Sequence, residues 1–130
     1  MVDDQSIRNI RDLKVYRAAY DLAMQVFEIS KRFPKEETYS LTDQLRRSSR
    51  SVAGNIREGF AKRRYEQVLV KHFTDALGSS EETRTWLEVS RDCGYLSAEA
   101  YERLDKGYDE INAMLYVFVE RWQSVAVGTD

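Results

Sequence analysis

Arginine side chains recur through residues 44–64 at spacings that place them on one side of a helix. Arg46, Arg50, Arg57 and Arg64 follow one another at intervals of four, seven and seven residues. At about 100° per residue, these positions share one face of an α-helix. The planar guanidinium group donates paired hydrogen bonds that match a phosphate or a carboxylate. The chemistry that this stripe offers is therefore the binding of anions.

Residue types that perform catalysis or bind metals are scarce in the chain. His72 is the only histidine and Cys93 the only cysteine among 130 residues. A di-metal carboxylate bundle needs a Glu-x-x-His pair, but the residue three positions before His72 is Leu69. Cys93 is expected at a helix end, with no histidine nearby to activate its thiol. We predict no catalytic residue, no metal site and no cofactor, and we interpret His72 as an interfacial packing residue.

Length and composition indicate one soluble domain that spans residues 1–130. Apolar residues make up 42% and charged residues 32% of the chain, and the formal net charge is −2. A lone cysteine is typical of a reducing compartment. No apolar run approaches the roughly 20 residues that a membrane-spanning helix needs, and the first residues are too polar for a signal peptide. We therefore expect a cytoplasmic protein that has no membrane partner.

The charges are unevenly distributed along the chain. Residues 46–71 contain eight cationic and two anionic side chains, a balance of +6. Residues 75–110 contain ten anionic and four cationic side chains, a balance of −6. The folded molecule is therefore expected to have a basic side and an acidic side. Such a distribution can attract an anionic partner or pair two copies of one chain.

The apolar pattern predicts long helices. Apolar residues recur at helical spacing from Tyr101 to Trp122, and Pro34 must end the first helix because it has no amide hydrogen. The helices are expected at about residues 11–32, 41–62, 65–92 and 98–123, followed by a frayed tail at 124–130. Because the links are short, the predicted fold is an all-α, antiparallel, up-and-down four-helix bundle.

Several details of these helices follow from residue type. The first helix has two adjacent apolar rows, one containing Tyr16, Tyr20 and Phe27 and the other containing Val15, Leu22 and Val26. So wide an apolar arc suits either a deeply buried helix or a subunit interface. Ser40 with Asp43 predicts a capping box for the second helix, Gly94 predicts a left-handed end for the third, and Ser97 predicts the cap of the fourth.

A row of polar residues lies on the second helix between its apolar and its basic face. Its members are Gln44, Arg47, Ser51, Asn55 and Glu58. Buried polar atoms need hydrogen-bond partners, so a row beside the core is best explained by a network at a helix contact or a subunit contact. We predict that role for the row in preference to a catalytic one.

The segment FPKEETYSLTDQLRRSSRSVAGNIREGFAKR, followed by ALGSSEE and GYLS, resembles the four-helix-bundle proteins encoded in intervening sequences of bacterial 23S rRNA genes, the S23 family. The similarity extends over about residues 11–120. The matching residues are Phe33, Pro34, Tyr39, Leu41, Gln44, Leu45, Arg46, Arg47, Ser51, Asn55, Ile56, Glu58, Gly59, Gly78, Ser79, Glu82, Gly94, Tyr95 and Leu96.

The resemblance implies an up-and-down bundle that assembles into a homo-pentameric ring. It also implies kinship with the accessory proteins of diversity-generating retroelements, which work with a reverse transcriptase and bind nucleic acid. It implies no settled molecular activity, because the family has none.

Two non-enzymatic functions are consistent with these features. In the first, the chain is an oligomeric scaffold that binds RNA or DNA through phosphate contacts. The residues expected to make those contacts are Arg46, Arg50, Arg57, Lys62, Arg63 and Arg64. In the second, it is a protein-interaction scaffold whose basic stripe pairs with the acidic surface of a neighbouring subunit or another protein. A solvated charged face with no partner is the remaining interpretation. Only Phe60 and Tyr65 lie near the stripe in sequence, so we expect recognition of shape or charge, not base stacking.

Overall fold

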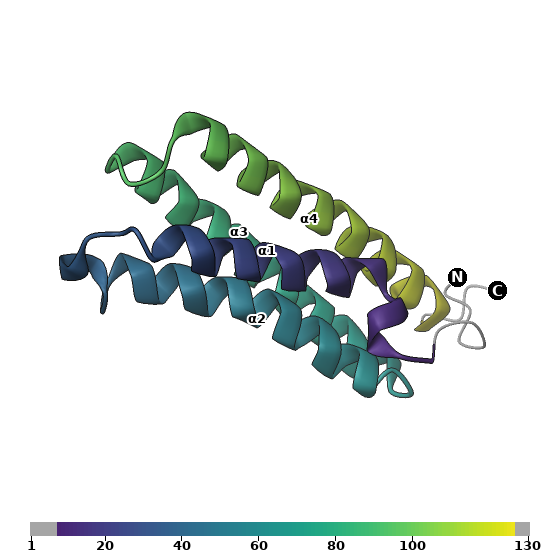
Figure 1. Cartoon of the computed structure of the whole chain (residues 1–130). Helices are drawn as coiled ribbons and strands as arrows, with labels where there is room; N and C mark the ends of the chain where they lie inside the picture. The colour runs from purple at the N-terminus through teal and green to yellow at the C-terminus, as the bar shows by residue number, and fades with distance from the viewer. Residues whose placement is uncertain (1–7, 127–130) are drawn as a thin grey trace.

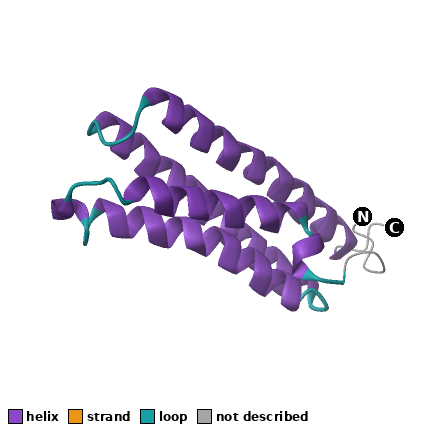
Figure 2. Ribbon diagram, viewed as in Figure 1, coloured by secondary structure: helices purple, strands orange, loops and turns teal. Residues whose placement is uncertain are grey.

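Four α-helices form most of the structure. The computed structural model of the chain describes residues 8–126, with side chains up to residue 121. The helices are α1 (Lys14–Ser30), α2 (Leu41–Ala61), α3 (Glu66–Asp92) and α4 (Ala98–Ala126), preceded by the short 3-10 helices η1 (Ile10–Asp12) before α1 and η2 (Lys35–Glu37) before α2. No strand occurs in the described range (Figure 2). The predicted all-α class is confirmed.

The helices are arranged as an up-and-down bundle. Each helix packs against the next one in the chain, and α4 returns to contact α1. Among the described helices, the diagonal pairs α1–α3 and α2–α4 make no close backbone contact. The connecting loops alternate between the two ends of the bundle, so neighbouring helices are antiparallel (Figure 1). Across the described residues, no helix combines the length and the apolar character needed to cross a bilayer.

The start of the first helix and the end of the last helix differ from the predicted positions. The first helix was expected near residue 11, but Leu13 is extended, with φ −82° and ψ 115°, and it separates η1 from α1. The side chain of Asn9 caps η1 by accepting a hydrogen bond from the backbone N–H of Arg11 at 3.0 Å. The last helix was expected to end at about residue 123, and α4 continues three residues further, to Ala126, with no glycine or proline to stop it. Residues 127–130 lie outside the described residues.

The prediction for the start of α2 was wrong, and the prediction for the end of α3 is confirmed. Ser40 makes no side-chain cap bond, and the predicted capping box with Asp43 was wrong. The carboxylate of Glu37 instead accepts the backbone N–H of Leu41 at 3.3 Å, from the preceding 3-10 turn. At the end of α3, Gly94 has φ +81°, and the N–H of Tyr95 donates to the carbonyl of Ser90 at 2.9 Å. This is a Schellman motif, so the predicted glycine stop is confirmed.

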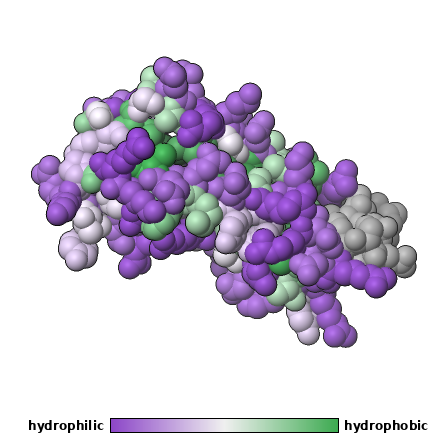
Figure 3. Space-filling view, viewed as in Figure 1, coloured by the Kyte–Doolittle hydropathy of each residue, from purple (hydrophilic) through white to green (hydrophobic). Residues whose placement is uncertain are grey.

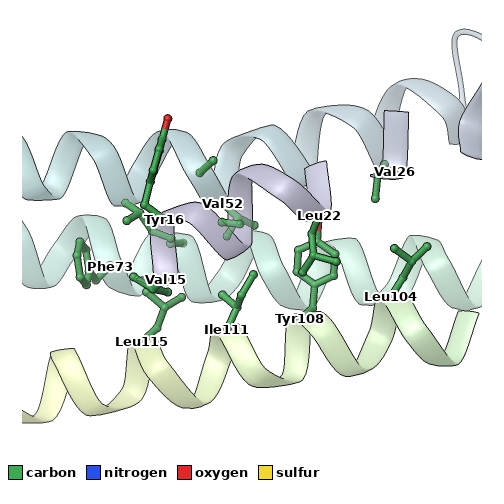
Figure 4. Close-up of a cluster of buried hydrophobic side chains, with 14 of the residues drawn as sticks. Val15, Tyr16, Leu22, Val26, Val52, Phe73, Leu104, Tyr108, Ile111 and Leu115 are labelled. Atoms are coloured by element: carbon green, nitrogen blue, oxygen red, sulfur yellow. The ribbon is translucent and has the colours of Figure 1, made fainter. Parts of the chain in front are cut away.

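A single apolar core lies between the four helices. Every helix contributes fully or nearly fully buried side chains, among them Val15, Ala19, Val26, Leu45, Val52, Ile56, Leu69, Phe73, Leu87, Leu104, Tyr108, Ile111 and Leu115. Figure 4 shows part of this cluster, with side chains of α1 and α4 directed toward one another. Polar side chains cover most of the outer face seen in Figure 3, where a few apolar patches interrupt them.

Candidate nucleic-acid interface

The arginine stripe of α2 lies along the seam between α2 and α1. Arg46 is half-buried there, and its Nε donates a hydrogen bond to Oγ of Ser30 at 2.8 Å. Its guanidinium carbon lies 4.9 Å from the ring centroid of Phe27. A cation over an aromatic face at this distance is attracted by the electron density of the ring. The end of α1 therefore holds Arg46 in place from two directions.

Arg50 and Arg57 continue the stripe and are both exposed. The guanidinium carbon of Arg50 lies 5.9 Å from the Phe27 centroid. Arg57 lies 5.9 Å from the centroid of Tyr16 and donates to the Tyr16 hydroxyl at 3.3 Å. Figure 4 shows this hydroxyl directed away from the other labelled side chains. The aromatic row of α1 therefore supports the arginines and leaves their outer N–H groups available to solvent.

The positive charge of this seam is not neutralised within the described part of the chain. Arg46, Arg50 and Arg57 form no ion pair with a described carboxylate, in contrast to Arg47, which pairs with Asp43 at 3.0 Å. Arg46 and Arg57 donate to neutral hydroxyl groups of α1, and Arg50 lies near the ring of Phe27. Three guanidinium groups held on one edge without a counter-charge form a surface that attracts anions.

An apolar groove of about 480 Å³ lies beside these arginines, between α1 and α2. Tyr16, Tyr20, Met24 and Phe27 line it from α1, and Ala53, Gly54 and the two exposed arginines line it from α2. Tyr20 and Met24 are 44% and 46% exposed, so part of the wide apolar arc of α1 faces outward. The other apolar row, containing Val15, Leu22 and Val26, enters the core, together with Tyr16 of the first row, which is only 5% exposed.

Lys62, Arg63 and Arg64 lie apart from the groove, at the turn between α2 and α3. Lys62 pairs with Glu58 at 3.3 Å. Arg63 folds back over the ring of Phe60, 4.0 Å from its centroid, and donates to the Phe60 carbonyl at 3.0 Å. Arg64 is exposed. The structure therefore divides the six predicted phosphate-binding residues into a seam group on α2 and a turn group after it.

The predicted polar row of α2 points toward α3, but its five members do not act alike. Ser51 accepts a hydrogen bond from Ser79 at 2.9 Å, and Asn55 Oδ1 lies 3.2 Å from Nδ1 of His72. The other ring nitrogen of His72 lies 3.6 Å from Glu58. Gln44 and Arg47 are exposed and make no such bond to α3. A subunit contact for these two residues stays a prediction.

Comparison with known proteins places this arrangement in a family. The family model described as 23S rRNA-intervening sequence protein matches residues 11–117, which include the whole seam, the groove and the polar row. The chain belongs to the 23S rRNA-intervening sequence protein family. The predicted resemblance is confirmed.

A solved structure supports the same family assignment. It is a protein with unknown function from the S23 ribosomal protein family of Bacteroides thetaiotaomicron. It has a TM-score of 0.74 and 25% sequence identity over 81% of this chain and 97% of its own. No curated protein matches the chain. Neither description names a catalytic activity.

The acidic side of the protein is partly neutralised by Arg84. Arg84 of α3 forms a two-pronged ion pair with Asp105 of α4, with N–O distances of 2.8 and 3.2 Å. It also contacts Glu81 at 3.1 Å and Asp109 at 3.3 Å. The hydrogen bond to Asp105 raises the pKa of Arg84 above its ordinary value. Asp75 pairs with Lys71 and Asp92 with Arg91, both at 2.9 Å, so five of the ten acids counted for this segment face a cation in the same chain.

The two residues with catalytic potential, His72 and Cys93, lie at a helix contact and at a helix end. His72 is half-buried between Asn55 and Glu58 on α2, and Cys93 is an exposed residue at the end of α3. Within the described residues, no three His, Cys, Asp or Glu side chains converge as metal ligands. The described cations that lack a carboxylate partner at the α1–α2 seam are Arg46, Arg50 and Arg57.

Sequence reasoning missed the contribution of α1 to the interface. Tyr16, Tyr20 and Phe27 are distant from the arginines in sequence, yet they lie beside them in the fold. The sequence predicts no base stacking, because Phe60 and Tyr65 are the only aromatic residues close to the stripe along the chain. The second apolar row of α1 was the available signal, since one row is enough to bury a helix against a core.

Proposed function

We propose that this protein is a non-enzymatic scaffold that binds RNA or DNA, with Arg46, Arg50 and Arg57 contacting backbone phosphates. The observation that carries this proposal is the lack of any described carboxylate partner for these three arginines. A held guanidinium group without a counter-ion loses little mobility on binding a phosphate, and it donates two parallel hydrogen bonds to it. The turn group, with Lys62, Arg63 and Arg64, extends the basic surface toward one end of the bundle.

The proposal includes assembly into a homo-oligomer, with a ring of five copies as the form that the family resemblance implies. Several weak phosphate contacts on each subunit would then act together on one strand, which multiplies the affinity without any new contact. Because the phosphate contacts release bound cations, the logarithm of the association constant would fall with the logarithm of the salt concentration, by about 0.7 to 0.9 per contact.

The proposal predicts a large loss of binding when two exposed seam arginines are reversed in charge. We expect Arg50→Glu combined with Arg57→Glu to weaken binding of single-stranded RNA roughly 100-fold or more, because two charge-assisted contacts become repulsive. The measurement is fluorescence anisotropy of a labelled RNA across a salt series, together with mass by light scattering. The slope against salt should also become shallower by about the number of contacts removed.

A matched variant on another face separates this effect from net charge. Arg103 and Lys106 of α4 are also exposed, and Arg103→Glu with Lys106→Glu changes the net charge equally. We expect this control to retain most of the RNA affinity. Equal losses in both variants would contradict a localised interface. Unchanged RNA binding with a fall in mass for the seam variant would instead support the second function, a scaffold whose basic seam pairs with an acidic surface of its neighbour.

A further inference from the structure

The apolar floor of the α1–α2 groove has no role in the phosphate contacts proposed above. Tyr20 and Met24 are nearly half exposed, although α1 already has a complete apolar row in the core. On the opposite wall, a Cβ added to Gly54 would have no atom within 4 Å outside its chain neighbours and its own helix backbone, so the groove is open at that point. Exposed apolar groups in a concave site commonly mark a surface that a partner covers.

We propose that an unpaired base of a single-stranded nucleic acid occupies this groove, so that the interface prefers single strands to duplexes. This inference rests on the proposed function and names the form of nucleic acid that the seam would bind. Aromatic side chains stack on any base, because every base has a flat π-face. In a duplex the bases are stacked on one another and cannot reach such a groove without leaving the helix.

The charges around the groove favour this occupant. Arg50 and Arg57 line the groove beside Tyr20 and Phe27, and no described carboxylate pairs with them. Anionic phosphates would therefore lie next to the guanidinium groups while the uncharged base enters the apolar floor. The groove volume of about 480 Å³ is within the range of roughly 300–1,000 Å³ that small-ligand sites occupy. Its wall and floor are poor in hydrogen-bonding groups, so stacking would select little among base types.

Gly54 gives a test that blocks the groove without weakening the fold. Gly54→Leu would place a side chain in the open space and should raise the melting temperature, since leucine is a better helix former than glycine. The matched control is Gly78→Leu, because Gly78 is also exposed within a helix and has the same open surroundings, on α3 outside the groove. A loss of binding in the first variant alone then cannot come from unfolding.

The experiment compares two labelled strands of about 12 nucleotides, an oligoadenylate and an abasic strand with the same number of phosphates. We expect wild type to bind the oligoadenylate more tightly, and Gly54→Leu to weaken only that complex, by roughly tenfold. Gly78→Leu should behave as wild type with both strands. Equal binding of both strands by wild type, or no effect of Gly54→Leu, would overturn the inference and leave the groove to another anionic partner such as an acidic peptide.

The two proposals fail in different ways. If wild type bound neither strand at low salt, the proposed nucleic-acid function itself would be wrong. If it bound both strands equally and Arg50→Glu with Arg57→Glu abolished that binding, the phosphate contacts would stand and the base-stacking inference alone would fail. A duplex of the same length, bound as tightly as the oligoadenylate, would also contradict the preference for single strands.

Discussion

Replacing Gly59 by leucine should unfold much of the bundle or lower its stability by about 3 kcal/mol or more. A Cβ at this position of α2 would lie 2.9 Å from Cβ of His72 and 2.9 Å from Cδ1 of Phe73, both on α3. The His72 atom is attached directly to the α3 backbone, and the Phe73 ring is 1% exposed, so neither can move aside. The two helices would have to separate. Urea unfolding followed by circular dichroism, at a fixed protein concentration, measures the loss.

Gly54 in the same helix provides the control for this prediction. Gly54→Ala meets open space and should raise the stability by up to about 1 kcal/mol, because alanine is the better helix former. Gly59→Ala gains the same helix propensity but meets the atoms of α3, and it should therefore be destabilising. If both alanine variants were stabilising, the close approach of α2 to α3 would be wrong.

The helices themselves were predictable because each has an apolar face at helical spacing. The buried residues Leu45, Val52 and Ile56 of α2 are those that the spacing places on one face. The helix ends were less predictable, because a cap depends on which polar group reaches the free N–H groups. Ser40 has the usual cap residue type, but Glu37 is the group that the fold brings to the N–H of Leu41.

Only the part of the candidate site that lies on α2 could be predicted from the sequence. The period of α2 places Arg50 and Arg57 on one side, and both are exposed. It contains no information about the rotation of α1, which decides that Tyr20 faces the groove while Leu22 faces the core. Interhelical geometry of this kind depends on the packing of all side chains at the contact. The aromatic floor of the groove therefore required the structure.

The charge count likewise could not predict which acidic side chains are paired in the fold. A balance of −6 over residues 75–110 suggested an extended acidic surface, open to a basic partner. The count could not show that Arg84 of α3 reaches Asp105 and Asp109 of α4. Such a cluster is already satisfied and offers less to a neighbouring basic seam than separate carboxylates would. This difference is one reason why we prefer nucleic acid to a second copy as the partner of the seam.

Phe73→Ala should cost about 3–5 kcal/mol, because it removes a buried ring at a point where three helices meet. Phe73 packs beside Gly59 of α2 and contacts Phe118 of α4 edge-on, with ring centroids 5.3 Å apart. Its loss would leave a cavity that the closely packed α2–α3 contact cannot fill. Phe73→Leu, which keeps most of the volume, should cost clearly less. Urea unfolding of both variants tests the difference, and equal losses would contradict the cavity explanation.

Combining the two sites tests whether Gly59 and Phe73 act on each other directly. In a Phe73→Ala background, the added methyl of Gly59→Ala would enter the space that the ring has left, so the second substitution should cost less than it does in the wild type. The relief cannot be complete, because Cβ of His72 still lies 2.9 Å from the added methyl. A double-mutant cycle should therefore give a favourable coupling energy of roughly 0.5–3 kcal/mol, and strict additivity would show that the helices separate instead of sharing one contact.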